Sequence, residues 1–238
     1  MGTEFDEKPA VPLWLWGAAL AAMVAELYLI FCWVPTEATM GIVQRIFYFH
    51  VPAAAVSFTA SFVGGIASIL YLVKREYRFD DLSLAANETV VVFAAVNIVM
   101  GSMWAKPIWG IWWTWDARLT SSFLLLFLYA AYLIIRRAAP VETRATVCAV
   151  ICILGMADVP LIYMSNRLFR TQHPSPVIGG GENSGLAPAM GKTLMFGMLA
   201  MFLLWWCILR LRRRVARLDR AAEDLVRRTH ELADVGRA

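Results

Sequence analysis

Six long apolar stretches alternate with short polar stretches along the chain. A helix needs about 20 apolar residues to cross the roughly 30 Å hydrocarbon core of a bilayer. Within lipid, only a helix or a closed barrel can satisfy all the backbone hydrogen bonds. The pattern therefore predicts an all-α integral membrane protein with six transmembrane helices. The expected spans are Leu13–Val34, Phe47–Val73, Leu84–Met103, Ser121–Ile135, Ala145–Met164 and Thr193–Leu209.

Basic residues are concentrated in alternate connections between these spans. The connections after the second and fourth spans, and the segment after the sixth, are rich in arginine and lysine, whereas the opposite connections are longer and poorer in both. By the positive-inside rule the basic set is cytoplasmic, so both termini are predicted to face the cytoplasm. The predicted outer connections are Pro35–Ile46, Trp104–Thr120 and Ser165–Lys192. The net charge of +4 thus indicates membrane topology rather than nucleic-acid binding.

Composition agrees with a membrane protein and excludes several kinds of chemistry. Hydrophobic residues make up 60% of the chain, against about 45–50% in a soluble domain. The four cysteines all fall in apolar runs without a Cys-x-x-Cys motif, so we expect buried free thiols rather than attached haem or redox catalysis. The glycine run at 179–181 lacks the lysine of a phosphate-binding loop. We therefore expect neither ATP hydrolysis nor another enzymatic activity from the chain itself.

Residues 104–120 hold five of the ten tryptophans, and Asp116 and Arg118 follow the last of them. Isolated tryptophans are common at membrane interfaces, because indole combines an apolar body with a polar N–H. That role does not require such a dense cluster. The segment therefore predicts a platform for a large, flat, aromatic ligand. Its tryptophans are Trp104, Trp109, Trp112, Trp113 and Trp115.

Two of the three histidines are predicted to share the membrane face of the tryptophan segment. His50 begins the second span and His173 lies in the connection before the sixth, while His230 lies in the C-terminal tail. Two imidazoles can ligate haem iron from opposite sides of the macrocycle. A zinc site is less attractive, because no carboxylate or thiol completes a four-ligand set. Arginine suits the two haem propionates, and the candidates are Arg45 and Arg118, followed by Arg167, Arg170 and Lys106.

The stretch WGIWWTWDARLT, residues 109–120, resembles the tryptophan-rich WWD signature of haem-handling proteins in cytochrome c maturation. Other families that share the signature usually continue after Trp-Asp with proline and an acidic residue, whereas this chain continues with alanine and Arg118. That continuation, the six spans, the short length and the stretch RIFYFHVP at 45–52 are similar to the haem exporter protein C (CcmC) family. The resemblance covers nearly the whole chain.

The resemblance implies a set of roles for residues and partners. His50 and His173 would be the axial ligands of a non-covalent b-type haem, and the WWD segment, including Asp116, would form its platform. The haem would be held at the periplasmic face of the bacterial inner membrane and presented to the haem chaperone CcmE, which bonds haem through its own histidine. The ATP-binding-cassette subunits CcmA and CcmB and the small membrane subunit CcmD would be further partners.

Two other functions stay open from the residues alone. A b-type electron-transfer cytochrome would favour histidine pairs within the spans, whereas this chain has no histidine at mid-membrane depth. A structural permease subunit could use the aromatic connection only to dock a partner. A redox couple with electron passage to a quinone would indicate the first, and a haem-free spectrum of the purified protein the second.

The predicted transmembrane unit covers residues 1–210, and residues 211–238 form a tail with a single apolar seam. The tail is either an extension of the sixth span or a docking helix for a cytoplasmic partner. Two acidic residues fall within spans, where an ionisable group suggests function or pairing. We expect Glu26 to be neutral and hydrogen-bonded between helices, and Asp158 to satisfy backbone donors near Pro160.

Overall fold

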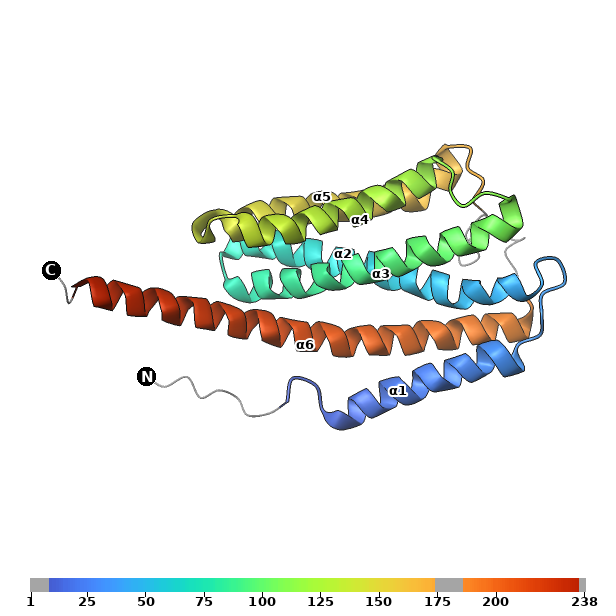
Figure 1. Cartoon of the computed structure of the whole chain (residues 1–238), viewed down its shortest axis with the longest axis horizontal. Helices are drawn as coiled ribbons and strands as arrows, with labels where there is room; N and C mark the ends of the chain where they lie inside the picture. Colours follow the sequence, from blue (N-terminus) through green and yellow to red (C-terminus); the bar gives the residue numbers. More distant parts are fainter. Residues whose placement is uncertain (1–8, 174–185, 236–238) are drawn as a thin grey trace.

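The computed structural model describes residues 9–173 and 186–235, and this part of the chain is helical throughout its length apart from short connections (Figure 1). Within these residues, six helices are long and apolar enough to cross a membrane, which confirms the predicted number. The glycine run at 179–181 lies outside the described residues. The helices are α1 (Leu13–Tyr28), α2 (Phe47–Lys74), α3 (Tyr77–Trp109), α4 (Ala117–Ala138), α5 (Val141–Leu168) and α6 (Pro188–Val235).

The helices run side by side along the long axis of the molecule (Figure 1). The pair α2 and α3 lies in the middle, with α4 and α5 on one side of it and α6 followed by α1 on the other. Two short helices, η1 (Leu29–Trp33) and η2 (Ile42–Ile46), connect α1 to α2. The end of α3 and the beginnings of α2, α4 and α6 therefore meet at one end of the bundle, which we call the tryptophan end.

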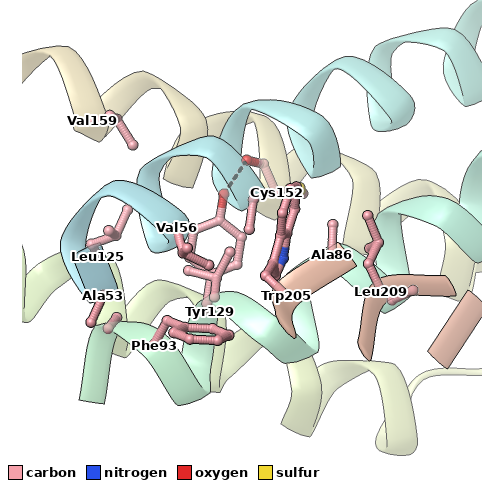
Figure 2. Packing of buried hydrophobic residues seen from close by; sticks show 14 of the residues in the cluster. Ala53, Val56, Ala86, Phe93, Leu125, Tyr129, Cys152, Val159, Trp205 and Leu209 are labelled. Carbon is pink, nitrogen blue, oxygen red and sulfur yellow. Dashed lines mark hydrogen bonds between the residues drawn. The ribbon is translucent and has the colours of Figure 1, made fainter. Parts of the chain in front are cut away.

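The core is packed with small side chains and a few large aromatic ones. Ala53 and Ala60 of α2 and Ala86 of α3 are buried, and such small residues let membrane helices approach closely. Figure 2 shows the Tyr129 ring among these helices, with its hydroxyl donating to the Cys152 carbonyl oxygen at 3.4 Å. Trp205 of α6 donates to the Thr89 hydroxyl of α3 at 2.9 Å (not drawn in the figure). The first contact joins α4 to α5, and the second joins α6 to α3 of the central pair.

Several helices extend beyond their predicted spans, and α3 and α6 do so the furthest. The predicted third span ended at Met103, but α3 continues to Trp109 and ends at Gly110, whose φ of 78° terminates the helix. Trp104 and Trp109 therefore lie on a helix rather than in a connection. Likewise α6 has 48 residues, which is about 72 Å at 1.5 Å per residue. It continues without interruption into the predicted tail and extends past the rest of the bundle (Figure 1).

Ion pairs hold the other end of the bundle together. Two of them use carboxylates near the start of α3: Arg136 of α4 binds Asp80 through both of its oxygens at 2.6 Å, and Arg220 of α6 binds Asp81 at 2.5 Å. Arg212 of α6 adds a third pair, at 2.5 Å, with Glu88, about two turns further along α3. Bidentate pairs between arginine and a carboxylate are among the stronger polar contacts in proteins. The tail is therefore anchored to the bundle at its beginning.

The prediction of buried free thiols is confirmed for three of the four cysteines. The predicted hydrogen bonds of the two acidic residues within spans are not found where the structure describes the chain. All four thiols are free, and only Cys32 is exposed. Glu26 is buried beside Gly197 of α6, yet neither of its oxygens has a hydrogen-bond partner among the described residues. Asp158 is also buried, neither of its carboxylate oxygens has a partner among the described residues, and α5 runs through Pro160 without a break. The predicted hydrogen bonds of both carboxyl groups are therefore wrong for the described part of the chain.

Candidate functional site

A cavity of about 370 Å³ lies at the tryptophan end of the bundle. This volume falls within the roughly 300–1,000 Å³ of small-molecule binding sites. Its walls come from α2, α3, α4 and α5 and from the connections beside α1 and α6. Most of the wall is apolar, but it includes several polar side chains, two of them imidazoles and one a guanidinium. Those considered below are His50, Asn97, Arg118 and His173.

His50 lies in the first turns of α2 with its ring held against α3. Its Nδ1 is 2.9 Å from the backbone carbonyl oxygen of Asn97. A carbonyl can only accept, so Nδ1 carries the proton and the Nε2 lone pair is available to a ligand. Gly101 makes this close approach possible, because a Cβ there would lie 2.9 Å from Cε1 of the ring.

His173 approaches the same cavity from the segment after α5. Its ring centre is 6.4 Å from that of His50, and the two ring planes are inclined by 32°. The His173 carbonyl oxygen accepts from the Asn166 amide and the Thr171 hydroxyl, each at 3.4 Å. The fold therefore brings together two imidazoles that are distant in the sequence, one on a helix and one on an irregular segment.

The tryptophans divide into two groups. Trp104, Trp109 and Trp113 line the cavity, and the first two pack edge to face with ring centres 5.1 Å apart. Trp112 and Trp115 do not line it and are 58% and 74% exposed. Trp115 nonetheless packs edge to face on Trp113 at 5.8 Å. The predicted platform therefore has an inner part on the cavity and an outer part on the molecular surface.

Asp116 lies outside the cavity lining and joins the WWD segment to the segment of His173. One carboxylate oxygen caps α4 by accepting from the Leu119 N–H at 2.9 Å. The other accepts from the Thr114 hydroxyl at 3.2 Å and from the Gln172 N–H at 3.3 Å. The geometry gives Asp116 a role in positioning the neighbours of the cavity.

The two leading arginine candidates are in different places. Arg118 lines the cavity and donates to the Asn166 side-chain oxygen at 3.1 Å. Arg45 is not part of the lining, and its guanidinium lies 5.7 Å from the centre of the Phe31 ring. Of the secondary candidates, Lys106 donates to the Gly110 carbonyl oxygen at 2.9 Å and Arg167 lies over the Tyr163 ring. Arg118 is thus the basic side chain among these four that contacts the cavity.

Sequence reasoning missed three residues of the site. Asn97 and Gly101 are four residues apart on α3, so they lie on the same helix face, and both contact the His50 ring. A polar residue and a glycine four positions apart, just before the tryptophan cluster, could have indicated these two residues. Asn166 contacts both Arg118 and the His173 carbonyl, and no pattern along the chain indicates it.

Comparison with known proteins gives consistent matches. A family profile described as "Heme exporter protein C" matches residues 5–228. The heme exporter protein C of Escherichia coli (strain K12) is 31% identical over 193 residues, which cover 80% of this chain and 72% of that protein. That of Bradyrhizobium diazoefficiens is 32% identical over 192 residues, 78% of this chain and 73% of that protein. A putative cytochrome c biosynthesis ccmC-like mitochondrial protein of Marchantia polymorpha is 30% identical over 186 residues, 72% and 79% respectively.

Proposed function

Because the chain belongs to the heme exporter protein C family, we propose that it binds haem in the cavity at the tryptophan end and delivers it during the biosynthesis of c-type cytochromes. The haem is cargo, and the chain binds and orients it rather than converting it. In this proposal the tryptophan end faces the periplasm, both termini face the cytoplasm, and the membrane is the bacterial inner membrane. The excess of basic residues at the opposite end supports this orientation.

One observation carries the proposal: His50 and His173 line one cavity with ring centres 6.4 Å apart. An imidazole nitrogen lies about 2.0–2.1 Å from a bound metal, so two rings on opposite sides of one ion have centres roughly 6 Å apart. The carbonyl of Asn97 engages Nδ1 of His50 and leaves Nε2 for the iron. We therefore assign His50 and His173 as the two axial ligands.

The remaining walls suit a porphyrin. Among the described residues, no group of three or more histidine, cysteine or acidic side chains could hold a metal ion. An iron held by two imidazoles therefore needs its other ligands from a macrocycle, as haem provides. Trp104, Trp109 and Trp113 supply flat apolar contacts. Arg118 supplies a charged hydrogen-bond donor for a propionate.

The exposed part of the WWD segment fits a delivery role. Trp112 and Trp115 lie beside the inner tryptophans but stay open to a partner. We propose that they contact the periplasmic haem chaperone CcmE when haem is presented, and that CcmA, CcmB and CcmD are the membrane partners. Two axial imidazoles exclude other iron ligands, so release requires the loss of one. His173 is the better candidate, because it lies on an irregular segment, whereas His50 lies on a helix.

Visible absorption spectra of the full-length protein test the assignment. We expect His50→Ala and His173→Ala each to lose the spectrum of two-histidine ligation, while His230→Ala, a histidine of the α6 tail, keeps it. Loading of the chaperone should fall in the same two variants. Unchanged haem content and unchanged loading in both would overturn the assignment. A reversible electron transfer to quinone by the wild type would instead indicate the cytochrome alternative.

A further inference from the structure

A second pocket lies beside the beginning of α1, at the end of the bundle opposite His50 and His173. Its volume is about 780 Å³, and it is bounded by the segment just before α1, the first residues of α3 and the middle of α6. Val11 of this segment is buried against Cys207 and Leu203 of α6. The wall formed by the N-terminal segment is therefore anchored by apolar contacts.

Positive charge dominates the lining of this pocket. Five of its side chains are arginines, and one, Asp81, is acidic. Asp81 is already paired with Arg220 of α6 at 2.5 Å. The arginines are Arg78, Arg210, Arg213, Arg214 and Arg217. The pocket is thus a concave surface with an excess of guanidinium groups.

Three of these arginines differ from the others at the same end of the bundle. Arg136, Arg212 and Arg220 are each held by a carboxylate of α3. By contrast, none of the ion pairs in the described part of the chain involves Arg210, Arg213 or Arg217. Their spacing of three and four residues puts them on one face of α6. This face is a site where an external anion would find several donors together.

The pocket lies where the apolar surface of the helices ends. Leu13 and Trp14 at the start of α1 are 84% and 71% exposed, and Trp206, one turn before Arg210, is 48% exposed. Exposed tryptophans at the end of an apolar span mark the level of the lipid headgroups. Apolar surface continues from there along α1, for example at Leu20 and Val24. An amphipathic anion with an acyl chain would contact both surfaces at once.

We propose that this pocket binds the phosphate headgroup of an anionic phospholipid, with the acyl chains along the exposed surface of α1 and α6. Arg210, Arg213 and Arg217 donate to the phosphate oxygens. Basic pockets between membrane helices bind acidic headgroups by this chemistry. The lipid would tie the beginning of α1 to α6. The site is independent of the haem cavity, which lies at the other end of the bundle.

Native mass spectrometry of the full-length protein in mild detergent measures this binding directly. The protein is titrated with short-chain phosphatidylglycerol and, separately, with phosphatidylcholine of the same chain length. We expect retention of the first and not of the second. Arg210→Gln/Arg213→Gln/Arg217→Gln should weaken it on the order of 100-fold, since each arginine near an anionic membrane contributes about 1 kcal/mol. The control Arg137→Gln/Arg227→Gln/Arg228→Gln removes equal charge elsewhere and should bind as the wild type does.

Further variants and ligands distinguish the sources of the anion. The same three positions changed to lysine should keep binding within about tenfold, since charge is retained. Inorganic phosphate should compete only weakly, and equal competition by phosphate would overturn the lipid assignment. Residues 1–8 include Glu4, Asp6 and Glu7. If phosphatidylglycerol binds only after these residues are deleted, the occupant is the chain's own acidic terminus and the proposal fails.

Discussion

Gly101→Ala should displace the His50 ring while leaving the fold intact. A Cβ at this position would lie 2.9 Å from Cε1 and 3.4 Å from Nδ1 of the ring. Carbon atoms in contact are about 3.5–4.0 Å apart, so the ring must move by roughly 0.6 Å or more. The Nδ1 contact to the Asn97 carbonyl, now 2.9 Å, would then reach about 3.5 Å and cease to be a good hydrogen bond.

The loss of that hydrogen bond sets the size of the expected effect. A hydrogen bond to the second ring nitrogen of a metal-ligating histidine contributes about 10–100-fold to metal affinity. We therefore expect the haem dissociation constant to rise by that factor. The added methyl group should cost about 1–3 kcal/mol of stability through overpacking, which leaves a folded protein. Absorbance titration of the apoprotein with haem measures the first quantity, and the spectrum should show weakened axial ligation.

Gly191→Ala is the matched control for this experiment. Gly191 lies near the beginning of α6, at the same end of the bundle, and a Cβ there meets nothing within 4 Å. The control should bind haem with the affinity of the wild type. If Gly101→Ala also binds within twofold of the wild type with an unchanged spectrum, the close contact between Gly101 and His50 does not govern ligation.

Three further predictions concern the residues around the cavity. Arg118→Gln should weaken the binding of haem about tenfold but leave the binding of haem dimethyl ester unchanged, because the ester lacks propionate charge; equal losses for both ligands would contradict a propionate contact. Asp116→Ala should lower stability by about 0.5–2 kcal/mol through loss of the α4 cap, and it should weaken haem binding by freeing the segment of His173. Asp116→Asn should retain the cap. Thermal unfolding measures the first effect and haem titration the second. Trp112→Ala/Trp115→Ala should keep haem affinity within twofold but reduce loading of the chaperone, and an equal loss of both properties would place these side chains on the haem itself.

The number of helices, and the end of the bundle that the candidate site residues share, could be predicted without the structure. Lipid leaves helices or barrels as the only spanning forms, so hydropathy alone indicated six helices. His50, the WWD segment and His173 each adjoin the end of a span, and alternate crossing brings these ends to one side. The boundaries were less predictable. The third span was predicted to end at Met103, but proline near the end of a helix is tolerated and α3 continues through Pro107 to Trp109.

The rotation of each helix about its axis came only from the tertiary packing. The rotation of α4 places Arg118 beside the cavity, and the path of the connection between α3 and α4 decides that Trp113 lines it and Trp112 does not. Helix rotation also brings the Asn97 carbonyl and Gly101 against His50. Hydropathy reports how much apolar surface a segment has. The free energy of placing that surface in lipid hardly changes when the helix rotates about its axis. Close packing of small and aromatic side chains between helices selects one rotation, and these contacts join residues that no spacing along the chain relates.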